Sequence, residues 1–258
     1  MSPRPSLALR NAAALERLLW NRRGERRLPG TAELDRALAR MSAGELWRLC
    51  EREPRGPLYF LPTREWIAAL ARRCRTLGRT VLEVGAGDGF VARRLARAAP
   101  GLRVIATDSG AWERPEGRMS AAERRRLRGE AIPGLRLGPE VLRLEALRAV
   151  RRFRPDVVLA VWLPPGPLFS RLVRAPCRWL LEVGAPGGVT GEGAYGWRFS
   201  HELVEGALVE RARCRLDAPA GPPRTRVTLY RGGLHEEFHE ERPREGDWLW
   251  QFRPQRRG

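Results

Sequence analysis

The stretch VLEVGAGDGF, residues 81–90, places three glycines at alternate positions after a short apolar run. The apolar run is typical of a buried strand, and the residues that follow it have the spacing of a helix. A glycine-rich turn between a strand and a helix lets backbone amides approach a ligand that a Cβ would exclude. In a parallel sheet such a turn lies at the carboxyl edge, where ligands bind. The stretch therefore predicts an α/β fold with a ligand site at this turn.

The spacing of the glycines disfavours a dinucleotide. A dinucleotide-binding turn has the pattern G-x-G-x-x-G, and its helix faces a pyrophosphate. Here Phe90 stands where the third dinucleotide glycine belongs, and Asp88 would bring negative charge into the phosphate site. Glu83 and Asp88 suit a ligand that carries a cationic centre, an amino group and a ribose, because carboxylates accept charge-assisted hydrogen bonds. S-adenosylmethionine is such a ligand.

The same stretch resembles the first motif of the class I methyltransferases, an acid, any residue and then G-x-G-x-G. Nineteen residues after Gly89, the run RVIATDS contains Asp108, which resembles the acid that binds both ribose hydroxyls in that family. Leu144-Glu145-Ala146 resembles the family's acid–alanine pair beside the adenine amino group, with Glu145 in place of the commoner Asp. The resemblance covers about residues 58–232. It implies an S-adenosylmethionine site made of Glu83, Gly85, Ala86, Gly87, Asp88, Gly89, Asp108, Ser109, Glu145 and Ala146.

Strand and helix patterns alternate along this part of the chain. Such alternation predicts a parallel sheet with right-handed crossovers. The expected strands are 81–84, 103–107, 141–144, 156–162, 179–183, 207–216 and 225–231, and the last two are close enough to be antiparallel. The predicted fold is a Rossmann-like, seven-stranded, mostly parallel sheet with helices on both faces, an antiparallel last strand and an N-terminal helical extension.

Three parts are expected along the chain. Residues 1–56 form the helical extension, with helices over 7–22, from a Thr31 cap to about 40, and from a Ser42 capping box. Residues 57–233 form the cofactor-binding domain, whose first helix starts at Thr63. Residues 234–258 form a tail whose end, DWLWQF, is apolar enough to pack back on the domain.

The acceptor side is predicted from two segments. Trp162-Leu163-Pro164-Pro165-Gly166 ends the fourth strand, where the family's amino-group methylases have a polar residue, two prolines and an aromatic. Leu163 and Gly166 depart from that pattern, so a grip on an amino nitrogen is not carried over. The segment after the fifth strand offers His201 as a candidate general base, with an ordinary surface histidine as the alternative. The predicted acceptor contacts are Trp162, Pro164, Tyr195 and Trp197.

Charge and cysteine content bound the remaining partners. The net charge of +18 comes from 48 basic residues, all of them arginine. A polyanion site or the codon bias of a GC-rich genome would each explain this. The four cysteines form no C-x-x-C pair, which favours a reducing, cytoplasmic setting, and no apolar run approaches the roughly 20 residues of a membrane span. No metal is predicted, because the H-E-x-x-H pattern at 235–239 lies in a charged tail without room for a cleft.

These observations predict a methyltransferase that moves a methyl group from S-adenosylmethionine to a small or medium-sized acceptor by in-line displacement. Two alternatives remain open. The arginine excess would suit methylation of RNA or of an RNA-associated protein. The missing polar residue before Pro164 would suit a non-catalytic scaffold that keeps the cofactor site.

Overall fold

A computed structural model describes residues 6–115, 133–185, 189–191, 199–219 and 221–233. These residues contain a seven-stranded sheet whose strands are β1 (Thr80–Val84), β2 (Arg103–Asp108), β3 (Leu142–Arg143), β4 (Val157–Val161), β5 (Trp179–Gly184), β6 (His201–Leu203) and β7 (Arg226–Arg231). The order across the sheet is β3-β2-β1-β4-β5-β7-β6. β7 runs antiparallel to both of its neighbours, and the pairs from β3 to β5 are parallel.

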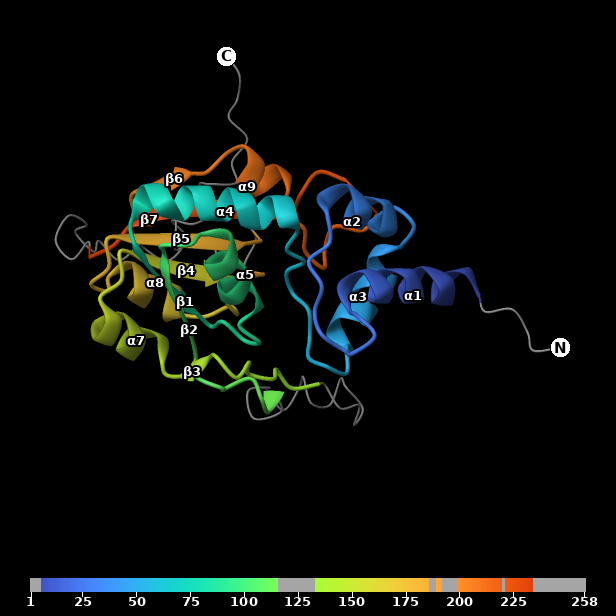
Figure 1. Cartoon of the computed structure of the whole chain (residues 1–258), viewed down its shortest axis with the longest axis horizontal. Helices are drawn as coiled ribbons and strands as arrows, with labels where there is room; N and C mark the ends of the chain where they lie inside the picture. Colours follow the sequence, from blue (N-terminus) through green and yellow to red (C-terminus); the bar gives the residue numbers. More distant parts are fainter. Residues whose placement is uncertain (1–5, 116–132, 186–188, 192–198, 220, 234–258) are drawn as a thin grey trace, which may run out of the picture.

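The sheet is covered by helices on both faces (Figure 1). α4 (Arg64–Leu77), α5 (Phe90–Ala98) and α9 (Ala207–Glu210) share one apolar core with the sheet, while α7 (Ala146–Phe153) and α8 (Leu168–Val173) share the other. Alternate residues of β1 and β4 enter the two cores, because successive side chains of a strand point to opposite faces. This confirms the predicted Rossmann-like sheet.

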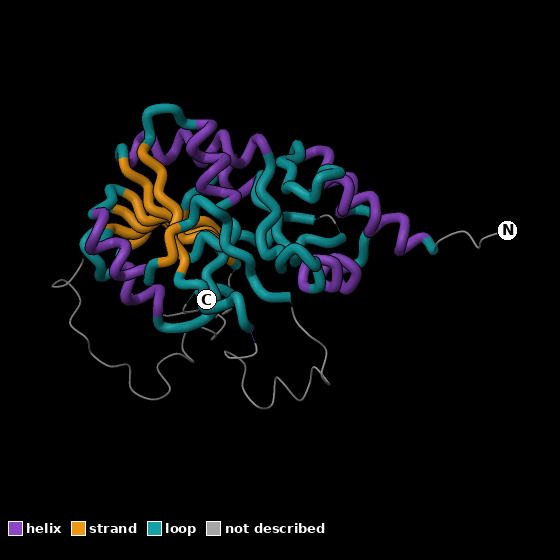
Figure 2. Tube along the Cα trace, turned by 60° about the horizontal axis from the view of Figure 1, so that its bottom comes forward, coloured by secondary structure: helices purple, strands orange, loops and turns teal. Residues whose placement is uncertain are grey.

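The N-terminal helices form a cluster of their own. α1 (Leu7–Leu19), α2 (Thr31–Leu38) and α3 (Ala43–Glu51) pack around buried leucines, and Leu58, Leu61 and Ala218 join that core. Figure 2 shows loops lying between the sheet and these helices. The predicted capping box of Ser42 is confirmed, since its hydroxyl accepts the Glu45 N–H and Glu45 accepts the Ser42 N–H.

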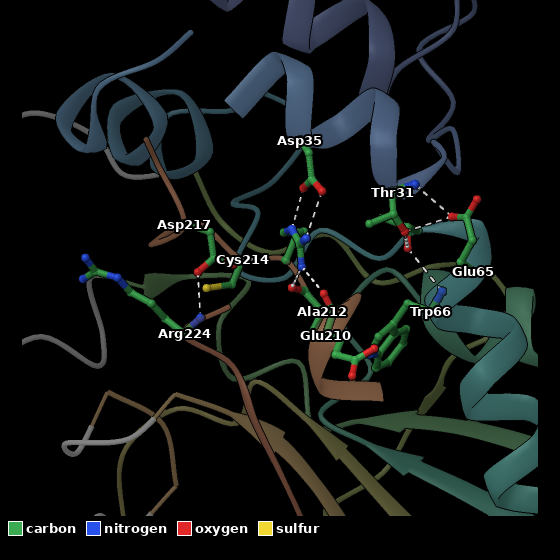
Figure 3. Close-up of polar contacts among 11 residues, drawn as sticks. Thr31, Asp35, Glu65, Trp66, Glu210, Ala212, Cys214, Asp217 and Arg224 are labelled. Atoms are coloured by element: carbon green, nitrogen blue, oxygen red, sulfur yellow. Dashed lines mark hydrogen bonds and ion pairs between the residues drawn. The ribbon is translucent and has the colours of Figure 1, made fainter. Parts of the chain in front are cut away.

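The segment after α9 ties this cluster to the sheet (Figure 3). Arg213 binds Asp35 of α2 through two parallel bonds, Nε to Oδ1 at 2.6 Å and Nη2 to Oδ2 at 2.9 Å. Leu61 N donates to the Arg213 carbonyl at 2.8 Å, and Phe60 forms an antiparallel bridge with Cys214. The extension is therefore held by residues from the far end of the chain.

One expected strand was wrong. The sixth strand is His201–Leu203, and part of the expected strand 207–216 is helix α9. Gly206, at φ +74°, lets the chain turn, and the Leu208 carbonyl accepts the Trp66 indole N–H at 3.0 Å, which anchors α9 on α4. α8 was not anticipated.

Thr31 is the first residue of α2 rather than its cap. The Gly30 N–H is bound by Glu33, and Thr31 Oγ1 instead contacts Thr63 at 2.9 Å and Glu65 at 3.0 Å. Thr63, where this helix was expected to start, is the N-cap of α4. None of the described helices is long and apolar enough to cross a membrane.

Candidate active site

A cavity of about 500 Å³ lies at the carboxyl ends of β1, β2 and β4. The strand order reverses between β1 and β4, and in open α/β sheets ligands bind at such a switch point. The volume falls within the usual range of about 300–1,000 Å³ for small-molecule sites. Most of the predicted site residues meet here: Glu83, Gly85, Ala86, Gly87, Asp88, Asp108, Ser109, Glu145, Ala146, Trp162 and Pro164. Gly89 does not line the cavity.

The glycine turn has the backbone that its sequence requires. Gly85 and Gly87 adopt φ values of +63° and +55°, a left-handed conformation that costs little only for glycine. A Cβ on Gly85 would lie 2.8 Å from the Leu163 side chain. The turn is thus a cradle that side chains at these positions would fill.

Asp108 is buried at the end of β2 and braces this turn. Its Oδ2 accepts the Gly87 N–H at 3.0 Å, and its Oδ1 accepts the Gly110 N–H at 2.7 Å. An ionised carboxylate has about four acceptor positions. As far as the described residues are concerned, two of them therefore remain for hydroxyl donors of a ligand.

Glu83 lies beneath the same turn and lines the cavity. Its Oε2 accepts the Ala92 N–H of α5 at 2.8 Å. Burial raises the pKa of Glu83 to about 8, with smaller contributions from Asp88 and Asp108. A cation bound nearby would favour the ionised form of Glu83.

Asp88 lines the cavity and is ion-paired with an arginine of the extension. Its Oδ2 lies 2.9 Å from Arg26 Nη1, and its Oδ1 accepts the Phe90 N–H. The pairing with Arg26 could not be predicted from the motif, because the two residues lie 62 positions apart. The other predicted acid, Glu145, is the N-cap of α7, and it brings Ala146 to the cavity beside the end of β3.

Trp162 forms the opposite wall with Pro164. It is nearly buried, and it adopts a φ of +58°, which is uncommon for a bulky residue. Its N–H is fixed to the Val183 carbonyl at 2.7 Å, and its ring stacks on Phe60 at 6.4 Å between centroids. The strand end is therefore turned so that this ring faces the extension.

The extension supplies a wall that sequence reasoning missed. It contributes aromatic rings and arginines from the loop after α1 and the segment after α3, with Arg215 beside them. The docking of the extension was expected, but the pattern held no signal for these side chains. The side chains of this wall are Trp20, Arg26 and Arg55 of the extension, Tyr59 and Phe60 just after it, and Arg215.

The remaining predicted residues are not in this cavity. His201 lies in β6 at the edge of the sheet, where its ring is 5.6 Å from that of Tyr230 and its Nδ1 is 2.7 Å from the Phe199 carbonyl. It is not among the residues that line the cavity, because β7 separates its strand from the switch point. Tyr195, Trp197 and the tail 234–258, with the pattern at 235–239, lie outside the described residues.

The strand order and the antiparallel β7 define a class I methyltransferase-like fold. No protein-family model matches the sequence, and no curated protein matches it at a significant level. Similar solved structures include the 23S rRNA methyltransferase ErmE, with 19% identity over 67% of this chain and 69% of that one, at a TM-score of 0.36. The human methyltransferase 10 domain containing protein has 11% identity over 77% of this chain and 96% of that one, at a TM-score of 0.39. The S-adenosylmethionine-dependent methyltransferase SibL has 16% identity over 88% of this chain and 70% of that one, at a TM-score of 0.38. At these identities and TM-scores the similarity carries no argument about an activity or an acceptor.

Proposed function

We propose that the protein is an S-adenosylmethionine-dependent methyltransferase that acts on a small or medium-sized acceptor. The observation that carries the proposal is the pairing of the G-x-G-x-G turn with Asp108 in one cavity, where the Asp108 carboxylate keeps acceptor positions to spare. When bound, the cofactor supplies an electrophilic methyl group on a cationic sulfur. Transfer of this methyl group would form a bond from an electron pair of the acceptor atom, break the carbon–sulfur bond with S-adenosylhomocysteine as the leaving group, and release any proton on the acceptor atom to water.

The residues present fit this cofactor. The left-handed glycines let the turn approach a ligand closely, and Asp108 would accept hydrogen bonds from the ribose hydroxyls. Glu145 would lie beside the adenine amino group. Asp108 and Glu145 give this side of the cavity carboxylates that suit a cation, and Glu83, whose pKa is raised by burial, would ionise when a cation binds nearby.

The protein's contribution to catalysis would be positioning and exclusion of water. An in-line displacement needs no covalent enzyme intermediate, so holding the two reactants at close range accounts for most of the rate gain. Trp162, Phe60 and the extension cover the cavity on the acceptor side. The proposal gives His201 no role as a base, because it does not line the cavity.

Calorimetric titration with S-adenosylmethionine, S-adenosylhomocysteine and NAD tests this proposal. We expect micromolar binding of the first two and none of NAD. Asp108→Asn should weaken S-adenosylmethionine about 10- to 100-fold, the scale of a hydrogen bond to a charged group. Tighter binding of NAD, or binding of none of the three, would overturn the proposal.

Asp156→Asn provides a matched control for that titration. Asp156 also accepts two backbone N–H groups, those of Arg79 at 2.8 Å and Thr80 at 2.9 Å, but it lies at the amino end of the strands. It is not among the residues that line the cavity. An equal loss of affinity in both variants would mean that Asp108 acts only through the stability of the sheet.

RNA is the second candidate acceptor, because the net charge of +18 would attract a polyanion. Binding of a single-stranded RNA oligomer is measured at two salt concentrations. An affinity that falls steeply with salt, together with methylation of the oligomer, would favour RNA over a small acceptor.

A further inference from the structure

Acids and arginines line different parts of the cavity. Asp108, Glu145 and Glu83 lie around the glycine turn, whereas Arg26, Arg55 and Arg215 lie toward the extension, together with Glu51. Of the arginines on that side, Arg215 has the most constrained setting. Its guanidinium carbon lies 3.8 Å from the centre of the Trp47 ring and 4.7 Å from that of Tyr59. The two rings therefore hold the cation in one orientation.

Arg215 differs from its neighbours in its pairing. Arg26 is bound by Asp88, and Arg55 is bound by Glu16 and Glu53. Within the described ranges, no carboxylate lies within ion-pair distance of Arg215, and its buried Nε has no hydrogen-bond partner. Burial lowers the pKa of Arg215, as expected for a cation taken from water without a bound anion.

Glu51 is an acid that acts electrostatically on Arg215 and also lines the cavity. Its Oε2 accepts the indole N–H of Trp47 at 2.8 Å. Glu51 thus fixes the ring that supports Arg215, and it forms no direct ion pair with the guanidinium. Within the described part of the chain, Arg215 therefore has no acid paired with it.

Flat apolar surfaces stand beside this cation. Tyr59 covers one face of Arg215, and the next residue, Phe60, stacks on Trp162. Trp162 directly follows β4, which pairs with β1, and the glycine turn directly follows β1. A ligand that reached from Arg215 toward the cofactor side would pass along these rings, which favour a planar apolar body.

We propose that the methyl acceptor is a small organic anion, with a planar apolar body along Phe60 and Trp162 and a carboxylate or phosphate bound by Arg215. This inference rests on the proposed function. A guanidinium packed against two rings presents its donors in a fork that matches either anion. The anion would also complement the cationic sulfur on the opposite side of the cavity.

The test titrates 1-naphthoate, 1-naphthyl phosphate and neutral 1-naphthamide into the protein, both alone and loaded with S-adenosylhomocysteine. We expect at least one of the anions to bind about tenfold or more tightly than the amide, since a charged hydrogen bond is lost in the amide. The two anions show which group the site prefers. Equal affinity for all three probes, or no binding of either anion, would overturn the inference.

Variants then test whether Arg215 causes the preference for anions over the amide. Arg215→Gln should remove the difference between anion and amide, while Arg215→Lys should retain part of it. Arg72→Gln removes the same charge from an exposed site on α4 and should leave the preference unchanged. Loss of the preference in Arg72→Gln, or its survival in Arg215→Gln, would contradict an anion site at Arg215. If Arg215→Gln does not fold, the comparison of probes on the wild-type protein still decides.

The two proposals fail separately. Binding of S-adenosylhomocysteine without any preference for the anions would leave the proposed function standing and remove the anion site. A preference for anions that depends on Arg215, in a protein that binds no S-adenosylhomocysteine, would keep the anion site and remove the methyltransferase proposal.

Discussion

Arg26 Nη1 lies 2.9 Å from Asp88 Oδ2, and this ion pair joins the N-terminal extension to the glycine turn. The Arg26 guanidinium also lies over the Phe90 ring, 4.2 Å from its centre. Asp88 stands between Gly87 and Gly89, so the acid inside the motif positions a wall of the cavity as well as lining it.

The ion pair should be measurable by a double-mutant cycle of Arg26→Gln and Asp88→Asn. Arg26 is mostly buried, whereas the Asp88 side chain is 37% exposed, so we expect a coupling energy of about 1 kcal/mol. The free energy of unfolding is measured in urea at low and high salt. Additive single effects at both salt concentrations would show that the pair contributes nothing.

Gly85→Ala should destabilise the protein more than Gly24→Ala. Both glycines have left-handed backbones, with φ values of +63° and +74°, so each alanine incurs a strain of about 1–2 kcal/mol. At Gly85 the new Cβ would also meet Leu163 at 2.8 Å, while at Gly24 no atom lies within 4 Å. Denaturant unfolding of the two variants isolates the cost of the contact. Equal losses would mean that Leu163 moves aside freely.

Glu83 should make the protein less stable as the pH rises. Its pKa is about 8 in the folded protein against an ordinary value of 4.5, so the folded state holds this proton more tightly. The resulting stabilisation is complete below pH 4.5 and is lost as the pH rises to about 8. Glu83→Gln should reduce that loss by at least about 1 kcal/mol, given that one pKa unit corresponds to about 1.4 kcal/mol.

The control for this pH profile is Glu182→Gln. Burial raises the pKa of Glu182 to about 7, so its contribution has the same sign but ends at a lower pH. Unfolding is followed from pH 5 to pH 9 in both variants and in the double variant. A wild-type profile that is flat, or that rises with pH, would contradict a buried neutral Glu83.

Arg213→Met should cost about 3 kcal/mol in unfolding free energy. Arg213 is buried, binds Asp35 through two bonds and donates to the Glu210 and Ala212 carbonyls, all of which lose their partner. Arg64→Met is the control, since Arg64 and Glu33 are 57% and 45% exposed, and their pair should contribute less than about 1 kcal/mol. Similar losses in the two variants would show that the Arg213 contacts do not hold the extension.

The parallel strands could be predicted because each is a short apolar run with local turn signals. Val81 to Val84 and Val157 to Ala160 are buried on both faces, and such strands are continuous in their hydrophobicity. The run after Gly206 was misassigned as a strand, because a few apolar residues do not distinguish a strand from one helical turn. Its packing against Trp66, a long-range contact, decides the outcome.

The cofactor side of the site could be predicted for a related reason. The glycine turn and Asp108 each follow a strand, so their place at one sheet edge comes from local sequence. The extension's wall depends on which loops meet in space, and no spacing encodes the contact of Arg215 with Trp47. His201 was chosen for its chemistry, and the edge position of its strand carries it away from the cavity.

The bond between Asp35 and Arg213 also has a consequence for how the protein is made. The two residues are 178 positions apart, so at about 5–20 residues per second the ribosome adds Arg213 roughly 10–35 s after Asp35. Until then the N-terminal helices lack the partner that holds them to the sheet. The newly made chain therefore completes its cavity only after Arg213 has been added, and a chain that stops before Arg213 would contain the glycine turn but lack the anchor for the opposite wall.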